Sequence, residues 1–247
     1  MFHVKQFSRL AEFCRDQQIV YNEETEQKFQ GFCQLLIEKN KVMNLTAVTE
    51  PSEIELKHFI DSASSISLIK DLFADIKELK VVDLGTGAGF PGIPLSILLP
   101  EAEFTLADAL NKRIDFLKEV VKDLTIKNAH PIQCRAEELG QSPERESFDL
   151  CVSRAVADLT VLLEYCLPLV KVGGAVILYK SGDYKQELEN AEYALEILGG
   201  ELKEVREFSL MNTEIRRSLI VICKRNAAPI KYPRRSGKPS KSPLIQK

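Results

Sequence analysis

Apolar residues follow two different rhythms along the chain. Over residues 5–70 they recur every three or four positions, as Phe29, Phe32 and Leu36 do within TEQKFQGFCQLLIEKN. This spacing predicts amphipathic helices. A polar break, NKVMNLTAVTEP, separates them from a shorter helical segment, EIELKHFIDS. We therefore expect an N-terminal helical extension over residues 1–75.

From Leu79 onward, short apolar runs alternate with amphipathic segments. The predicted strands are residues 80–84, 103–107, 130–134, 148–153, 174–180, 203–209 and 217–223. The predicted helices are residues 91–99, 111–124, 158–170 and 184–198. Strands separated by helices are typical of a parallel sheet covered on both faces. The last two strands have no helix between them and allow an antiparallel pair. We expect an α/β domain with a seven-stranded, mostly parallel sheet over residues 76–224.

Composition restricts the classes of protein that the chain can belong to. Hydrophobic residues make up 45% and charged residues 28% of the 247 residues, as in ordinary globular proteins. No apolar run approaches the roughly 20 residues of a membrane helix. The N-terminus, MFHVKQFSRLAEFC, does not resemble a signal peptide. Six scattered cysteines form no C-x-x-C pair. We expect a cytoplasmic protein with no membrane partner and no metal site.

Positive charge is concentrated at the C-terminal end. Ten Lys/Arg and no acid lie between Ile215 and Lys247, which leaves 23 basic and 36 acidic residues in the rest. An acidic body with a basic end favours a polyanionic partner, although a solvated solubility tail is the alternative. Residues 225–247 contain too few apolar side chains to fold alone. We expect a basic tail that contacts phosphates, with Tyr232 stacking on a base, and whose removal leaves cofactor binding unchanged.

The stretch VVDLGTGAGFPGIPLSILLP combines a strand, a glycine loop and a helix, as in many nucleotide sites. A dinucleotide fingerprint would need a third glycine where Phe90 stands, and the Gly-Lys-Ser/Thr of a P-loop is missing. Gly85, Gly87 and Gly89 instead follow Asp83 at alternate positions. This arrangement resembles motif I of the S-adenosylmethionine-dependent methyltransferases. Glycines there give a ligand without phosphate room to approach the backbone.

Acidic residues after the next two strands extend this hypothesis. Asp108 ends the second predicted strand, where a carboxylate can accept hydrogen bonds from ribose hydroxyls. NAD enzymes place an acid there too, so Asp108 indicates a nucleoside without identifying it. CRAEEL puts Ala136 and Glu137 where an adenine edge would lie; the alternative for Glu137 is an acid favoured by a helix N-terminus.

The sequence after the fourth strand, CVSRAVADL, bears on the methyl acceptor. It lacks the Asp/Asn-Pro-Pro-Tyr/Phe pattern of adenine amino methylation, and neither Cys151 nor Cys166 is placed as a nucleophile for pyrimidine C5. Arg154 can orient a guanine, hold a phosphate or lie near the cofactor carboxylate, or else form a structural salt bridge. Upstream, Asn44, His58 and Asp61 could face a ligand, although helix caps and packing polars are the more common alternative.

Together, MNLTAV, HFIDS, DLGTGAGFPGIPL, RAEEL, VSRAVADL, YKSG and KYPRRSGKPSKSPL resemble the bacterial ribosomal RNA small-subunit methyltransferase G family, also called glucose-inhibited division protein B. The resemblance runs from about Asn44 to Leu244. It implies a Rossmann-like class I methyltransferase that transfers a methyl group from S-adenosylmethionine to guanine N7 of 16S ribosomal RNA, free or in an assembling small subunit. By motif, the cofactor contacts fall on Gly85, Phe90, Ala136, Glu137 and Arg154.

The expected sites follow from this resemblance and from the residues above. The cofactor site also takes in Asp83, Gly87, Gly89 and Asp108, and Arg154 is the expected catalytic residue. The expected RNA-binding residues are Lys180, Arg234, Arg235, Lys238 and Lys241. Guanine N7 keeps a free lone pair at neutral pH, so alignment of the reactants suffices and no general base is needed. Two alternatives stay open, a nicotinamide-dependent oxidoreductase and a non-catalytic RNA-binding or assembly factor with a vestigial loop.

Overall fold

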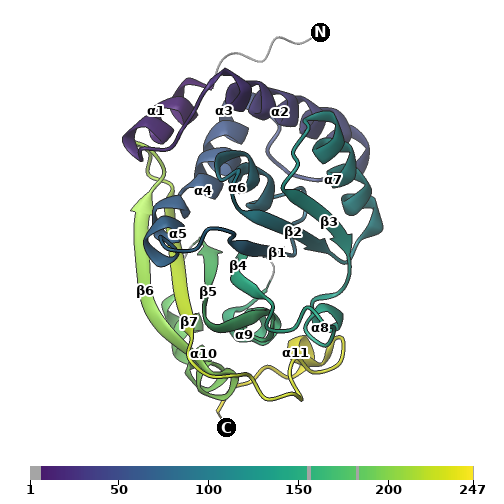
Figure 1. Cartoon of the computed structure of the whole chain (residues 1–247), viewed down its shortest axis with the longest axis vertical. Helices are drawn as coiled ribbons and strands as arrows, with labels where there is room; N and C mark the ends of the chain where they lie inside the picture. Colours follow the sequence, from purple (N-terminus) through teal and green to yellow (C-terminus); the bar gives the residue numbers. More distant parts are fainter. Residues whose placement is uncertain (1–6, 155–156, 182–183, 247) are drawn as a thin grey trace.

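Seven strands form a single sheet in the order β3-β2-β1-β4-β5-β7-β6 (Figure 1). The computed structural model describes residues 7–154, 157–181 and 184–246. Strands β1 to β5 pair in parallel, whereas β7 is antiparallel to both β5 and β6. The strands are β1 (Lys80–Leu84), β2 (Glu103–Asp108), β3 (Ala129–Gln133), β4 (Phe148–Arg154), β5 (Val170–Lys180), β6 (Gly200–Ser209) and β7 (Arg216–Lys224). The predicted fold is confirmed, with each strand within four residues of its expected bounds.

Helices cover both faces of the sheet because neighbouring residues of each strand point to opposite sides. Val81 belongs to the apolar core under the N-terminal helices, α6 and α7, whereas Val82 belongs to the core under α9 and α10. The helices after β1 are α6 (Gly92–Leu98), α7 (Asn111–Asp123), α8 (Ala136–Leu139), α9 (Leu159–Cys166), a 3-10 turn η2 (Leu167–Leu169), α10 (Lys185–Leu198) and α11 (Lys238–Lys241). Helices α8 and α11 were not predicted, since four residues show no periodicity.

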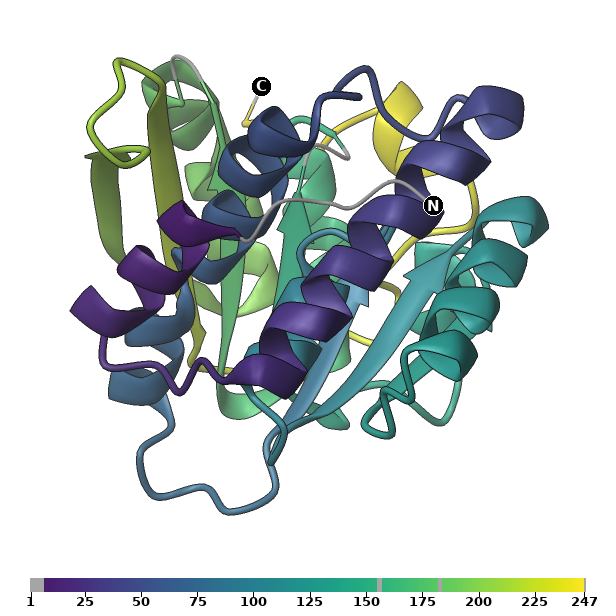
Figure 2. The same ribbon diagram turned by 90° about the horizontal axis from the view of Figure 1, so that it is seen from above.

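The N-terminal helices lie over one face of the sheet (Figure 2). They are α1 (Ser8–Asp16), α2 (Glu23–Met43), α3 (Pro51–Ile54), a π-helical turn η1 (Glu55–Ile60), α4 (Asp61–Ala63) and α5 (Ile66–Leu72). Helix α2 begins where the Asn22 side chain accepts from Thr25 N at 2.9 Å and ends at Asn44, whose φ is +49°. The predicted break before α3 is confirmed. The division into residues 1–75, 76–224 and 225–247 stays a prediction, although the first region shares its core with the sheet.

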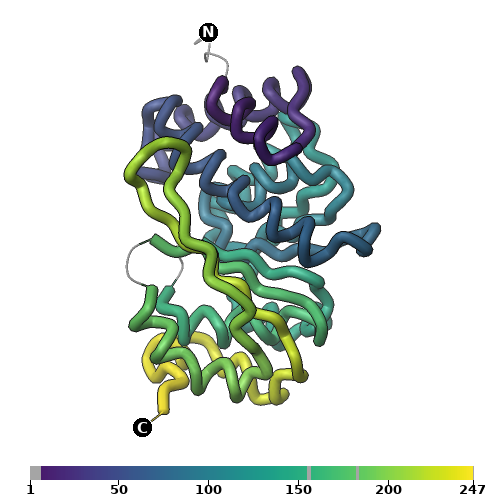
Figure 3. The backbone as a smooth tube through the Cα atoms, turned by 90° about the vertical axis from the view of Figure 1, so that its left-hand side faces the viewer, coloured from purple at the N-terminus to yellow at the C-terminus, as the bar shows by residue number. Residues whose placement is uncertain are grey.

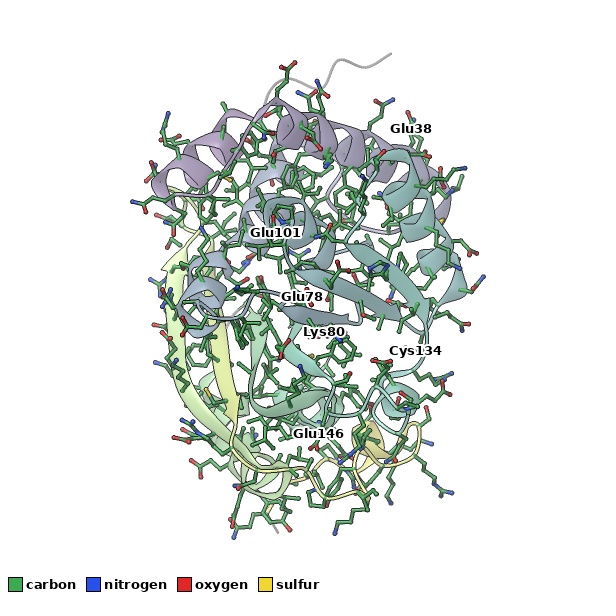
Figure 4. All side chains as sticks on the ribbon, viewed as in Figure 1. Glu38, Glu78, Lys80, Glu101, Cys134 and Glu146 are labelled. Carbon is green, nitrogen blue, oxygen red and sulfur yellow. The ribbon has the colours of Figure 1, made fainter. Side chains whose placement is uncertain are left out.

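The C-terminal segment packs along the body instead of extending into solvent. Figure 3 shows it at the end of the molecule opposite the N-terminal helices, and Figure 1 shows it running from β7 to α11, beside α8. Tyr232, Pro239 and Leu244 are buried. Glu146, which lies between the sheet and this segment (Figure 4), accepts from Lys224 Nζ at 2.7 Å and from Ala228 N at 3.2 Å. Composition did not reveal this packing, because polar contacts with the body supply what the few apolar side chains cannot.

Candidate functional site

The glycine loop leaves β1 in a conformation that requires glycine. Gly85, Gly87 and Gly89 have φ values of +72°, +62° and +98°. A Cβ on Gly89 would lie 2.7 Å from Ile93 Cγ1, so this position admits no side chain without repacking. A Cβ on Gly87 would meet no atom closer than 3.9 Å. Gly89 therefore serves the packing of α6, while Gly87 leaves open space beside the loop.

Asp83 supports the loop from inside the protein. Its Oδ2 accepts from Gly92 N at 2.8 Å, at the start of α6. Burial raises the pKa of the Asp83 carboxyl to about 6. Among the described residues, its Oδ1 and Thr86 Oγ1 are buried without a hydrogen-bond partner. The predicted role of Asp83 in the cofactor site is thus that of a support beneath the loop.

Asp108 joins the end of β2 to the glycine loop. Its Oδ2 accepts from Gly87 N at 3.0 Å and from Arg113 Nη1 at 3.1 Å, and its Oδ1 accepts from Leu110 N at 2.9 Å. Each carboxylate oxygen can accept two hydrogen bonds, so Oδ1 keeps one position for a ligand. Asp108 thus anchors the loop, which the sequence did not indicate, and its role as a ribose acceptor stays a prediction.

A cavity of about 410 Å³ lies beside this loop, at the carboxyl ends of β1, β2 and β3. Ligands of open α/β sheets bind at this edge. Its lining residues are Leu84, Gly85, Ala107, Asp108, Ala109, Leu110, Arg113, Cys134, Ala136 and Tyr165. This cavity fits a nucleoside-containing ligand such as S-adenosylmethionine. The loop beside it is left-handed, Asp108 has an unused acceptor, and the volume is typical of small-molecule sites.

Glu137 is buried behind the wall of this cavity. Its Oε1 accepts from Gly237 N at 2.9 Å and lies 3.4 Å from the hydroxyl of Tyr165. Tyr165 and the neighbouring Ala136 both line the cavity. Figure 4 shows Cys134, which also lines the cavity, beside α8. The predicted adenine-facing pair is therefore at the cavity, and Glu137 in addition contacts the C-terminal segment.

Arg154 ends β4 and is held by residues of the N-terminal helices. Its Nη1 donates to Asp61 Oδ2 at 2.9 Å and to Lys57 O at 3.3 Å. Its Cζ lies 5.0 Å from the centre of the Phe90 ring. The ring of His58 stacks on the same Phe90 at 4.5 Å. The π-helical turn η1 and the glycine loop thus meet at Arg154, an arrangement that spacing along the chain did not predict.

His58 is uncharged in this site. Burial, followed by the nearby Arg154 guanidinium, lowers the pKa of His58 to about 3. Nδ1 of His58 lies 3.1 Å from Lys57 O and 3.2 Å from Arg154 Nη2, and its Nε2 lies 2.8 Å from Thr46 Oγ1. Asn44 caps α2, whereas His58 and Asp61 pack against Arg154, and contact of either with a ligand stays a prediction.

A second cavity, of about 420 Å³, opens beside Arg154 at the carboxyl ends of β4 and β5. It is lined by Val48, Lys57, His58, Asp61, Arg154, Tyr179, Lys180, Ser181, Glu187 and Arg217. We call it the Arg154 cleft. Four cations and two carboxylates give it a positive balance. Asp61 bridges Arg154 and Arg217, whose Nε is 3.2 Å from Oδ1. Lys180 pairs with Glu187 and donates to Ala157 O.

The predicted RNA-binding residues of the C-terminal segment differ in their surroundings. Arg234 donates its backbone N, Nε and Nη2 to Glu164, whose side chain is 1% exposed. This buried pairing gives Arg234 a structural role, which differs from the expected contact with RNA. Arg235, Lys238 and Lys241 are exposed on and beside α11. Lys180, the fifth candidate, lies in the Arg154 cleft.

Neither a metal cluster nor a membrane-spanning helix occurs in residues 7–154, 157–181 and 184–246. No group of three or more His, Cys, Asp and Glu residues there is arranged to hold a metal ion. None of the helices in the same residues has the length and apolar character to cross a membrane.

The sequence of the chain is similar to sequences of known proteins. The sequence pattern of the family rRNA small subunit methyltransferase G matches residues 25–219. Ribosomal RNA small subunit methyltransferase G from Acetivibrio thermocellus is 51% identical over 224 residues, 90% of each chain. The protein of the same name from Lachnoclostridium phytofermentans is 50% identical over 227 residues, 92% of each chain.

Solved structures share the fold at low sequence identity. A SAM-dependent methyltransferase from Aquifex aeolicus superposes with a TM-score of 0.51 and 17% identity, covering 72% of this chain and 96% of that one. M. jannaschii TYW2 in complex with AdoMet gives a TM-score of 0.50 and 17% identity, covering 66% and 76% of the two chains.

Proposed function

Because the chain belongs to the rRNA small subunit methyltransferase G family, we propose that the cavity beside the glycine loop holds S-adenosylmethionine and that the Arg154 cleft receives the target guanine. The protein is an S-adenosylmethionine-dependent methyltransferase that transfers a methyl group to N7 of a guanine in 16S ribosomal RNA. Its partner is the small-subunit RNA, free or in an assembling particle, and we place it in the cytoplasm.

One observation carries the assignment of the two cavities. Phe90, at the end of the glycine loop, packs against Arg154, so the loop beside the first cavity touches the wall of the second. Both cavities open at the carboxyl edge of the sheet, where β4 lies next to β1. A methyl donor in one cavity and an acceptor in the other would meet at this boundary.

Arg154 is suited to orienting guanine. Three of its five N–H groups are directed to Asp61, Lys57 and His58, which leaves two for a ligand. Donation to guanine O6 fixes the plane of the base and leaves the N7 lone pair free. The fixed geometry of the guanidinium supplies the near-attack alignment on which this reaction depends.

S-adenosylmethionine, when bound, supplies a methyl group activated by its sulfonium charge. The N7 lone pair forms the new N–C bond while the S–C bond breaks and its electrons stay on sulfur. The positive charge therefore moves to the guanine ring. The uncharged His58 adds no repulsion to that charge.

The deciding experiment is methyl transfer followed by nucleoside analysis. The purified protein is incubated with labelled S-adenosylmethionine and either 16S ribosomal RNA or small subunits, and the digest is analysed by mass spectrometry. We expect 7-methylguanosine. Thermal protection by a nicotinamide cofactor but not by S-adenosylmethionine would favour the oxidoreductase. Cofactor and RNA binding without any methylated nucleoside would favour a non-catalytic factor.

A further inference from the structure

The C-terminal segment contacts the wall of the proposed cofactor cavity. Gly237 N donates to Glu137 Oε1 at 2.9 Å, although 100 residues separate them in the sequence. Ser240 Oγ lies 3.3 Å from the hydroxyl of Tyr165, which also contacts Glu137. Tyr165 lines the cavity itself. The segment therefore touches both side chains that close the end of the cavity next to Ala136.

Buried polar contacts hold the segment in this place. Glu164, directly before Tyr165 in α9, accepts three hydrogen bonds from Arg234. Arg145 donates to the carbonyl oxygens of Ala228 and Tyr232. Pro233 packs so closely on the end of α8 that a Cβ on Gly140 would lie 2.6 Å from Pro233 Cγ. The segment is thus tied to α8 and α9, the two elements that carry Glu137 and Tyr165.

These contacts leave Glu137 able to serve two partners at once. Its Oε1 is occupied by Gly237 and Tyr165, whereas no hydrogen bond within the described residues uses its Oε2. An adenine amino group is a donor that an unused carboxylate oxygen can accept. Fixing one oxygen of Glu137 by the segment also fixes the direction of the other.

We propose that Arg234, Gly237 and Ser240 are part of the cofactor site: they position Glu137 and Tyr165 for the adenine end of S-adenosylmethionine. This inference rests on the proposed function. It reverses the expectation that removal of the basic tail leaves cofactor binding unchanged. Arg234, Gly237 and Ser240 act as positioning residues, since they reach the ligand only through Glu137 and Tyr165.

Coupling of this kind is reciprocal. If the docked segment strengthens cofactor binding, bound cofactor must strengthen docking of the segment by the same factor. Trypsin offers a readout, because Arg235 and Lys241 are exposed cleavage sites within the segment, each followed by serine. A contact that served only to hold the fold together would be indifferent to cofactor.

The first experiment measures the affinity for S-adenosylhomocysteine, the demethylated product, by calorimetry on the full chain. Arg234→Met combined with Glu164→Gln removes the ion pair without leaving a buried carboxylate unpaired. We expect at least tenfold weaker binding with the folded state retained by circular dichroism. The matched control, Arg235→Ala with Lys238→Ala and Lys241→Ala, removes three exposed cations of the same segment and should leave this affinity unchanged.

The second experiment follows trypsin cleavage of the wild-type segment with and without S-adenosylhomocysteine. We expect slower cleavage after residues 235 and 241 at saturating ligand, and no such protection in the Arg234→Met/Glu164→Gln variant. Equal affinity of that variant and the wild type, or wild-type cleavage indifferent to ligand, would overturn the inference alone. Failure of the wild type to bind the ligand at all would instead overturn the proposed function.

Discussion

The guanidinium carbon of Arg154 lies 5.0 Å from the centre of the Phe90 ring. Arg154 comes from the end of β4 and Phe90 from the glycine loop, so the pair joins the wall of the Arg154 cleft to the loop that borders the cofactor cavity. Asp61 and His58 restrict the guanidinium to one orientation over the ring. Movement of either residue would therefore disturb the alignment of donor and acceptor.

Arg154→Lys keeps the charge but removes the planar group of donors. We expect turnover to fall about 100-fold, the cost of a misplaced reactant, while cofactor and RNA affinities change little. Initial rates and calorimetry on the same preparation measure both quantities. Arg225→Lys, an exposed arginine paired with Glu201, is the control and should keep wild-type turnover. Normal turnover in Arg154→Lys would exclude the proposed role.

Asp108→Ala should weaken both cofactor binding and the fold. It removes the proposed ribose acceptor and leaves Gly87 N, Leu110 N and Arg113 without their partner. Each lost hydrogen bond is expected to cost about 0.5–1.5 kcal/mol, because water can reach the exposed Leu110 and Arg113. The matched control is Asp149→Ala, a buried carboxylate that accepts from Lys80 N and Lys171 away from the cavity. It should lower the free energy of unfolding only. Equal cofactor affinity in the two variants would make Asp108 purely structural.

Gly87→Val tests the open space beside the loop. A branched residue at positive φ is strained by about 1–2 kcal/mol, and its side chain would enter the space expected for the ligand. We expect cofactor binding to be lost in a chain that still folds. Gly173→Val shares the positive φ and the open surroundings, but lies within β5, away from the loop. Calorimetry should show loss of binding only at position 87; loss at both would point to general strain.

The lowered pKa of His58 predicts that the free energy of unfolding falls as the pH is lowered. Its pKa is near 6.5 in an unfolded chain and about 3 in the folded protein. The neutral ring therefore stabilises the fold above pH 6.5, and this contribution is lost as pH falls from 6.5 toward 3. His58→Gln cannot titrate. From pH 7 to pH 5 we expect the wild type to lose about 1–2 kcal/mol more unfolding free energy than the variant, measured by urea denaturation. Parallel pH profiles would mean that His58 titrates normally.

The exposed cations Arg235, Lys238 and Lys241 should set the salt dependence of RNA binding. Their replacement by alanine should make the slope of log K for RNA binding against log salt concentration shallower. The expected change is roughly 0.7 for each phosphate of a single-stranded RNA that is no longer neutralised. Lys77, Lys127 and Lys203 are exposed near the first residues of β1, β3 and β6, outside the C-terminal segment, and serve as the control set. An unchanged slope in the first set would place the RNA site on the rest of the body, including the Arg154 cleft.

Local patterns in the sequence predicted most of the strands and the glycine loop. Buried strands are runs of apolar residues, and the glycine loop with Asp108 lies within one strand–helix–strand unit, so spacing alone brought them together. The one-turn helices α8 and α11 were missed, because four residues are too few to show a period. The helical segment that carries His58 was predicted, but its π-helical form was not. The contact of Arg154 with Asp61 joins residues 93 apart and depends on how the N-terminal helices pack.

Arg234 has a contact that its sequence does not indicate. In sequence it is one of several cations of the C-terminal segment, and in the structure it faces a buried carboxylate, Glu164, 70 residues earlier. Charge counts indicate that a segment is basic without showing which charges are already neutralised. The neighbouring Arg235, Lys238 and Lys241 keep the predicted exposure.

The contact between Gly237 and Glu137 also has a bearing on how the protein is made. The ribosome synthesises β7, which completes the sheet, before it reaches Gly237. A chain interrupted after Arg225 would contain all seven strands but could not bring Gly237 onto Glu137. Formation of the sheet and completion of the proposed cofactor site are therefore separable, because the second needs residues that the first does not use.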